Sequence, residues 1–156
     1  MTPAIRFLKI AGIDFTTHSY ECEVHEDFGL HAASQLGLPP DQVYKTLLVH
    51  QDKQVVTAVI PVSCMLSLKE VAKAAKLKKV EMMKPLDAER LTGYKVGGIS
   101  PLAQKKLLPT VLDDSAMAFD EILVSGGKRG LSVGVAPGDM VRLMNWIAAP
   151  IGDHHD

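Results

Sequence analysis

The sequence predicts a single domain of the α+β class, in which helices and strands are mixed without a regular alternation. Its 156 residues are an ordinary length for one compact domain. Helix-like segments and short strand-like runs follow one another irregularly, whereas a doubly wound parallel sheet needs strand and helix to alternate. Hydrophobic residues make up 47% of the chain and aromatic residues only 5%, so aliphatic side chains must fill a substantial core.

The helices are predicted by the residues that start and stop them. Thr2 is placed to cap a helix that begins at Pro3, and Gly12 is placed to end it. Ser67 and Glu70 have the spacing of a capping box, which predicts a helix from Leu68 onward. Apolar periodicity and similar terminal residues predict further helices over 29–37, 85–91 and 137–144.

Runs rich in β-branched residues predict the strands. Two of them, 43–50 and 55–62, flank the polar residues 51–54 and therefore predict a hairpin. Further strands are expected at 14–20, 118–125 and 131–136. We expect the domain to span residues 1–147 and the tail at 148–156 to be frayed.

Charge and composition narrow the kind of protein. The net charge is −1, yet residues 61–130 carry 12 Lys/Arg against 8 Asp/Glu. Because the grip on nucleic acid grows with the number of phosphates neutralised, we expect weak RNA binding, or binding of one RNA end, and no DNA binding. A solvated helix face explains the same lysines equally well. No apolar run approaches the roughly 20 residues of a membrane span, and the N-terminus lacks a signal-peptide pattern, which predicts a soluble, cytoplasmic protein.

The usual signatures of metal and nucleophile chemistry are missing from the sequence. Cys22 and Cys64 form no CxxC pair, and the histidines show neither HxxxH nor HxH spacing. No Ser-His or Cys-His arrangement stands out either. We therefore expect no metal, no cofactor and no nucleophile supplied by the protein.

Lys45 is the first candidate for chemistry. On a strand it shares one face with Val43, Leu47 and Val49, so it is the one charge on an aliphatic face. At the floor of a pocket, low dielectric would strengthen its attraction for an anion or an ester oxygen. The alternative is an edge-strand lysine that discourages aggregation or reaches out to water.

Two glycine-rich segments are the other candidates. Gly97 and Gly98 allow close approach of the backbone to a ligand, and Pro101 fixes the exit of this loop. The segment SGGKRG at 125–130 offers a second set of amides, with two cations beside it. Neither segment has P-loop or GxGxxG spacing. An ordinary turn and an exposed hairpin are the alternatives for the two segments.

Four segments together resemble the YbaK/EbsC family of Cys-tRNA(Pro) deacylases, which is related to the editing domain of bacterial prolyl-tRNA synthetase. They are YKTLLV at 44–49, KKVEM at 78–82, LTGYKVGGISPLAQKK at 91–106 and SGGKRGL at 125–131. Their order and spacing agree along nearly the whole chain. Residues 21–27, the 51–54 turn and the tail are less typical, and Leu91 stands where a small residue is expected.

The resemblance implies a mixed, mostly antiparallel, curved and barrel-like sheet with surrounding helices. It also implies trans-editing: hydrolysis of the ester that joins a wrong amino acid to the 3′ end of tRNA, with Cys-tRNA(Pro) as the expected substrate. Family roles carry over as catalytic groups to Lys45, Gly97 and Gly98. They carry over as substrate-binding groups to Tyr20, Phe28, Thr46, Ile99, Ser100, Pro101, Ser125, Gly126 and Gly127. Exposed cations expected near tRNA phosphates are Lys105, Lys106, Lys128 and Arg129.

In the mechanism that the resemblance implies, the thiol of the substrate or the terminal ribose hydroxyl assists the reaction, with no cofactor. Aminoacyl-tRNA is then the partner, and prolyl-tRNA synthetase is a second candidate partner. Two other functions compete with this one: a non-catalytic module that binds aminoacyl-tRNA or a synthetase, and a hydrolase of another small acyl ester. A lysine on an aliphatic face favours catalysis over simple RNA binding.

Overall fold

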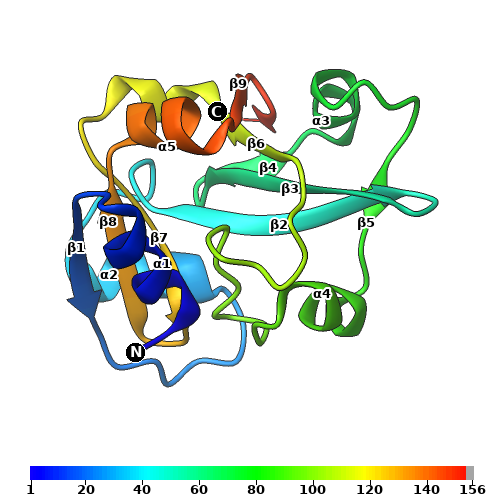
Figure 1. The fold of residues 1–156 in the computed structure, drawn as a ribbon. Coiled ribbons are helices and arrows are strands. Elements are labelled where there is room, and N and C mark those ends of the chain that lie inside the picture. Colours follow the sequence, from blue (N-terminus) through cyan, green and yellow to red (C-terminus); the bar gives the residue numbers. More distant parts are fainter. Residues whose placement is uncertain (154–156) are drawn as a thin grey trace.

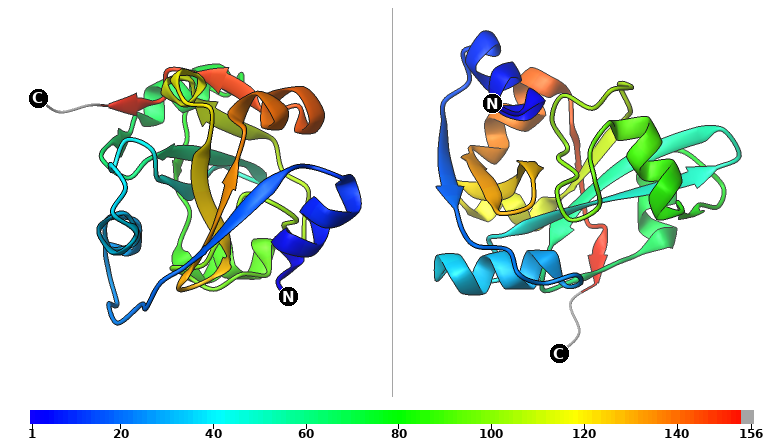
Figure 2. Two further views of the ribbon diagram at one scale, coloured as in Figure 1. Left: turned by 90° about the vertical axis from the view of Figure 1, so that its left-hand side faces the viewer. Right: turned by 90° about the horizontal axis from the view of Figure 1, so that it is seen from below.

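The computed structural model describes residues 1–153 as an α+β domain with three small sheets (Figures 1 and 2). Its helices are α1 (Pro3–Ala11), α2 (Phe28–Leu36), α3 (Leu68–Ala74), α4 (Pro85–Thr92), η1 (Asp114–Ala118) and α5 (Pro137–Met144). Its strands are β1 (Phe15–Ser19), β2 (Tyr44–Gln51), β3 (Gln54–Pro61), β4 (Met65–Leu66), β5 (Glu81–Met82), β6 (Thr110–Asp113), β7 (Ile122–Lys128), β8 (Leu131–Val135), β9 (Ile147–Ala149) and β10 (Gly152–Asp153). None of the helices in this part of the chain has the length and apolar character to cross a membrane.

The central sheet is mixed, as the sequence predicts. Its strand order is β5-β2-β3-β6-β9, with β2 antiparallel to β3 and β5, and with β6 parallel to β3 and β9. A second, antiparallel sheet has the order β1-β8-β7, and a third consists of β4 and β10. The α+β class and the mostly antiparallel pairing are therefore confirmed.

The barrel-like closure that the resemblance implies does not form in residues 1–153. The two larger sheets meet at the start of β2, where Val43 forms a single parallel bridge with Leu123. The amide of Leu123 donates to the carbonyl of Gln42 at 3.0 Å across the same junction. Because this contact is so short, the sheets splay apart beyond it, and Figure 1 shows the β2–β3 hairpin leaving the β1-β8-β7 sheet at an angle.

Local signals in the sequence set the element boundaries. The Thr2 hydroxyl accepts a hydrogen bond from the Ile5 amide at 3.3 Å, and Gly12 ends α1 with φ +68°. The Ser67 hydroxyl caps α3 by accepting from the Glu70 amide. In the hairpin, the strand pairing runs without a shift from Tyr44 opposite Pro61 to Gln51 opposite Gln54, which flank the turn at 52–53. These side-chain caps explain why the predicted starts of α1 and α3 are confirmed, whereas α2, α4 and α5 begin without a side-chain cap.

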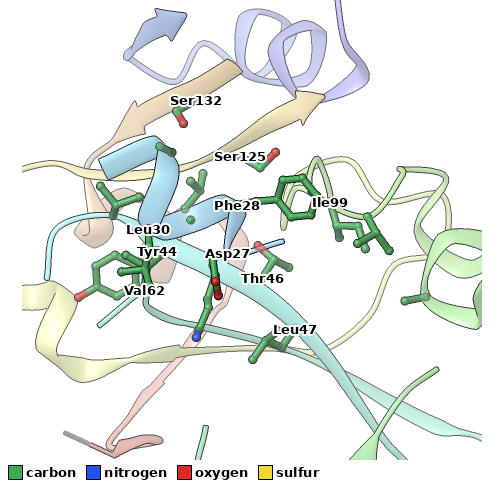
Figure 3. Close-up of a pocket in the computed structure, with 18 of the residues that line it drawn as sticks. Asp27, Phe28, Leu30, Tyr44, Thr46, Leu47, Val62, Ile99, Ser125 and Ser132 are labelled. Atoms are coloured by element: carbon green, nitrogen blue, oxygen red, sulfur yellow. The ribbon is translucent and has the colours of Figure 1, made fainter. Parts of the chain in front are cut away.

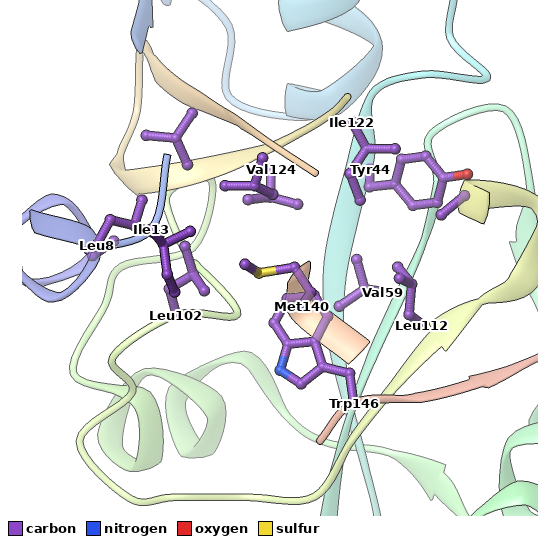
Figure 4. Packing of buried hydrophobic residues seen from close by; sticks show 14 of the residues in the cluster. Leu8, Ile13, Tyr44, Val59, Leu102, Leu112, Ile122, Val124, Met140 and Trp146 are labelled. Carbon is purple, nitrogen blue, oxygen red and sulfur yellow. The ribbon is translucent and has the colours of Figure 1, made fainter. Parts of the chain in front are cut away.

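Two clusters of hydrophobic side chains form most of the core. The larger cluster lies between the β1-β8-β7 sheet, α1 and α5, and Figure 4 shows Leu8, Leu102, Met140 and Trp146 packed together there. The smaller one lies under α3. It includes Val49, Ile60, Val71, Val111 and Ile151. The two clusters cover both faces of the central sheet. The edge of β2 that is not paired with β3 remains as the place where a cavity can form.

The end of the chain is not frayed as far as residue 153, and that prediction is wrong for this part. Asp113 is 2% exposed, and its Oδ1 accepts hydrogen bonds from the amides of Ile151 at 3.0 Å and Gly152 at 2.9 Å. Ile151 itself is fully buried. A buried carboxylate on β6 thus fixes β10 beside β4. Residues 154–156, the rest of the predicted tail, lie outside the described residues.

Candidate active site

A cavity of about 380 Å³ opens beside the junction of the two larger sheets (Figure 3). This volume lies in the range typical of small-molecule sites. Its walls come from β2, the start of α2, the β5–α4 segment, the loop at 95–99 and the facing strands β7 and β8. Seven of the predicted site residues line it, and they are Tyr20, Phe28, Lys45, Thr46, Gly97, Ile99 and Ser125. Segments far apart in the sequence therefore converge on one cavity.

A gap in strand pairing explains why β2 dominates the wall. At one end Val43 bridges to β7, and at the other Val49 and His50 pair with β5. Between these contacts, β2 is paired only with β3. All residues from 43 to 48 line the cavity because the unpaired edge of the strand faces it.

Lys45 is half-buried in this wall. Burial lowers the pKa of its ammonium group, and the neighbouring Cys64 and Asp27 side chains oppose that shift. Desolvation weakens the hold on the proton because the cation loses its hydration. A cation with little water around it stabilises a nearby oxyanion more strongly than a solvated one does. The pocket interpretation of Lys45 thus fits its position better than the edge-strand alternative.

Thr46 brings an unpartnered hydroxyl to the same site. Its Oγ1 is buried and has no hydrogen-bond partner among residues 1–153. Buried hydroxyls in folded proteins are nearly always satisfied, so an orphan next to a cavity is typical of a group that binds a ligand. Figure 3 shows Thr46 between Asp27 and Ile99 in the view of the cavity.

The loop at 95–101 contributes to the cavity through Val96, Gly97 and Ile99. Gly97 has φ +89°, and a Cβ there would lie 2.8 Å from a ring carbon of Phe28. No hydrogen-bond acceptor for its N–H exists among residues 1–153, so this amide is free to meet a ligand. The loop is anchored from α4, because the Val96 amide donates to the Glu89 carboxylate at 2.8 Å.

Gly98, Ser100 and Pro101 of this loop do not line the cavity. The Gly98 amide donates to the Lys95 carbonyl at 2.8 Å, so it is already used in a turn. Ser100 is fully buried, and its Oγ accepts from the Leu102 amide at 3.2 Å inside the loop. Pro101 is buried next to it. These three residues shape the loop, whereas Gly97 and Ile99 reach the cavity.

The second glycine-rich segment packs against the first. A Cβ on Gly98 would lie 2.7 Å from the Cα of Lys128, so the two backbones touch. Gly126 lies against Leu131, and Gly127, with φ +105°, lies against Tyr94. Neither Gly126 nor Gly127 lines the cavity. The second segment therefore does not present the expected amides to the cavity. Its glycines instead allow the two loops to pack closely, and within 125–130 only Ser125 lines the cavity.

Arg129, on the second loop, contacts both the first loop and the start of α2. Its Nε donates to the Val96 carbonyl at 3.0 Å, and its guanidinium lies 4.7 Å from the centre of the Phe28 ring. The sequence predicts a phosphate contact for Arg129 and gives no hint of this bridging. The guanidinium is exposed, as are the ammonium groups of Lys105, Lys106 and Lys128. All four cations thus remain accessible to a charged partner.

Several cavity residues were not predicted. Asp27 precedes Phe28 at the mouth, and Ser132 faces the cavity from β8. Apolar lining comes from Val62, Met82, Met83 and Ala88, among others. Their positions depend on which strands meet, so no local pattern marks them. The lining contains no histidine or cysteine, and no group of three potential metal ligands exists among the described residues.

The fold and this cavity define a small α+β domain with a mostly apolar, ligand-sized cavity that contains one half-buried lysine. The chain belongs to the aminoacyl-tRNA editing domain family, whose model matches residues 30–143. It is 43% identical over 145 residues to a protein of Enterococcus faecalis described as a proposed Cys-tRNA(Pro)/Cys-tRNA(Cys) deacylase, EbsC, with 92% of this chain and 88% of that protein covered.

Solved structures share the fold at low sequence identity. A crystal structure described as a proposed trans-editing enzyme for prolyl tRNA synthetase matches with a TM-score of 0.82 at 19% identity, covering 98% of this chain and 99% of that one. The crystal structure of a hypothetical protein matches with a TM-score of 0.87 at 22% identity, covering 97% and 99%. These likenesses confirm the fold that the sequence predicts.

Proposed function

We propose that the protein is a free-standing editing enzyme that hydrolyses the ester of mischarged aminoacyl-tRNA, with Cys-tRNA(Pro) as its main substrate. The observation that carries this proposal is the half-buried Lys45 beside the orphan hydroxyl of Thr46 in a mostly apolar cavity. Membership of the editing-domain family and the similarity to EbsC supply the substrate class.

In the proposed mechanism, Lys45 and the Gly97 amide stabilise the charge that develops on the ester oxygen atoms. Both groups are held in place before the reaction begins, so little reorganisation is needed in the transition state. Gly98 serves the reaction indirectly, by allowing the close contact with Lys128 that keeps Gly97 in position. Tyr20, Phe28, Ile99 and Ser125 enclose the aminoacyl group and exclude water.

The attacking group comes from the substrate or from water, because the cavity lining offers no cysteine and no histidine to activate a hydroxyl. With a cysteinyl ester, the substrate thiol attacks its own carbonyl carbon. The ester C–O bond breaks, the 3′ oxygen of the tRNA takes up a proton, and a thiolactone leaves. Alternatively, the terminal ribose hydroxyl assists the attack of water.

The exposed cations near the cavity suit the phosphates of the tRNA acceptor end. Lys105 and Lys106 follow the first glycine loop, and Lys128 and Arg129 belong to the second. Each neutralised phosphate adds affinity that falls with salt. Since the net charge of the chain is only −1, we also propose that a synthetase, prolyl-tRNA synthetase first, helps to hold the tRNA.

The test is turnover of Cys-tRNA(Pro) by the purified protein, compared with its Lys45→Ala variant. We expect the variant to lose about 10²–10³-fold in kcat, as is typical when one oxyanion-stabilising group is removed. Lys53→Ala, in the exposed turn of the same hairpin, is the matched control and should keep full activity. Binding of aminoacyl-tRNA without turnover would instead support the non-catalytic module.

A further inference from the structure

The cavity contains one positive and one negative side chain. Among the described residues that line it, only Lys45 and Asp27 carry a formal charge. Asp27 comes from the start of α2, whereas Lys45 comes from β2, so the two charges reach the cavity from different elements. Figure 3 shows the carboxylate of Asp27 among the side chains that surround the cavity.

Asp27 is the N-cap residue of α2, but its carboxylate does not cap the helix. An aspartate in this position normally caps the first turn by accepting from a backbone amide. Asp27 instead has φ +51° and ψ +41°, in the left-handed region, and its side chain makes no capping hydrogen bond. Its carbonyl still accepts from the His31 amide at 3.0 Å, so the helix begins normally.

The start of α2 is held firmly in this geometry. A Cβ on Gly29 would lie 2.2 Å from a methyl carbon of Val62, so the helix backbone is pressed against the end of β3. On the next residue, the Phe28 ring is covered by the guanidinium of Arg129. A left-handed non-glycine residue between such fixed neighbours is typical of a functional position.

The carboxylate of Asp27 has neither a hydrogen-bond donor nor an ion-pair partner among residues 1–153. It is near enough to Lys45 to influence the lysine's protonation, yet the two form no direct ion pair. A gap between opposite charges in one cavity suits a ligand that carries both a cation and an electron-rich carbonyl.

We propose that Asp27 binds the α-ammonium group of the aminoacyl ester and thereby selects esters with a free amino group. This inference rests on the proposed function. The ester offers a carbonyl oxygen to Lys45 and an ammonium group to Asp27, at opposite ends of a short fragment. A hydrogen bond between two charged groups is the strong kind and fixes orientation as well as affinity. An N-acylated ester has no cation for Asp27 and leaves the carboxylate without its counter-charge.

The experiment compares two substrates in three proteins. The substrates are Cys-tRNA(Pro) with a free α-amine and its N-acetylated form, and the proteins are wild type, Asp27→Asn and Glu26→Gln. Glu26→Gln removes the same charge from the adjacent residue, which does not line this cavity. We expect Asp27→Asn to lower kcat/KM about tenfold on the free amine and to leave the N-acetyl substrate unchanged. Wild type and Glu26→Gln should keep their preference for the free amine.

A binding measurement separates this inference from the catalytic proposal. Calorimetry would use 3′-cysteinylamino-3′-deoxyadenosine, whose amide resists cleavage, with and without N-acetylation. We expect the free-amine analogue to bind wild type about tenfold more tightly than the acetylated one, and Asp27→Asn to bind both equally. The wild-type preference should fade as pH rises through about 7.7–8.0, where an α-amino group loses its charge.

Three results overturn the inference. Equal losses on both substrates in Asp27→Asn would assign Asp27 to the orientation of Lys45 or to the fold. An unchanged free-amine preference in Asp27→Asn would remove it from recognition, even if wild-type turnover is normal. An analogue that does not bind wild type, together with no turnover of Cys-tRNA(Pro), would overturn the proposed function as well.

Discussion

The two glycine-rich loops look alike in sequence and differ in what their glycines do. In the loop at 95–101, Gly97 lines the cavity, and its amide has no acceptor among the described residues. In the loop at 125–130, Gly126 and Gly127 are packed against Leu131 and Tyr94 and do not line this cavity. The same composition thus supplies a ligand-facing amide in one loop and close packing in the other. Glycine content by itself does not distinguish the two.

The largest effect on activity within this comparison is expected for Gly97→Ala. A Cβ would meet the Phe28 ring at 2.8 Å and force a left-handed conformation on alanine. We expect kcat for Cys-tRNA(Pro) to fall by about 10²-fold, as when an oxyanion-hole donor is displaced. Single-turnover kinetics would measure this, with circular dichroism to confirm folding. Full activity would show that the first loop, like the second, only packs.

Gly127→Ala should affect stability more than chemistry. Its φ is +105°, and an added Cβ would lie 2.9 Å from a ring carbon of Tyr94, so any side chain there is strained. We expect a loss of about 1–3 kcal/mol in the free energy of unfolding. Urea unfolding would measure it, and kcat of the folded fraction should stay close to wild type. A large fall in kcat without loss of stability would place the second loop in the reaction.

Arg129→Ala sharpens the comparison because Arg129 links the two loops. Its removal deletes the hydrogen bond to the Val96 carbonyl and the contact with the Phe28 ring. We expect kcat/KM to fall about tenfold, since the two interactions together are worth about 1–2 kcal/mol. Lys128→Ala, on the adjacent exposed residue, is the matched control. An equal, salt-dependent loss in both variants would mean that Arg129 acts only on tRNA phosphates.

The smallest effect is the pH dependence of stability that Lys45 contributes. Burial lowers the pKa of Lys45 in the folded protein, so over the interval between the folded and unfolded pKa values the unfolded chain binds more protons. Stability should therefore rise with pH across that interval, up to the ordinary lysine value of about 10.4. Urea unfolding over a pH series should show this rise in wild type and not in Lys45→Met. Parallel curves for the two proteins would indicate that Lys45 is solvated.

Much of the fold follows from local signals. The caps at Thr2, Gly12 and Ser67 and the hairpin at 44–61 depend on residues near one another in the chain, so they can be read directly. The short strands β6, β9 and β10 could not be predicted, because each exists only through pairing with a distant strand. The same holds for the tail, whose order depends on Asp113.

For the site, the sequence by itself determined the candidate lysine and the two glycine-rich loops. Thr46 was expected only from the family resemblance, and its lack of a hydrogen-bond partner among residues 1–153 is a finding of the tertiary structure. Alternation along a strand and the special backbone freedom of glycine are properties of neighbouring residues, and they need no knowledge of the fold. The resemblance to a family added the substrate class.

Only the tertiary structure decided which of these residues share a cavity. Gly97 lines the cavity, whereas the adjacent Gly98 packs against the backbone of Lys128. The tertiary structure also brought Asp27 to the same cavity as Lys45. The physical reason is that the cavity lies where the pairing of β2 is interrupted between β7 and β5. Such an interruption depends on how distant strands meet, and that is settled by packing across the whole domain rather than by any local pattern.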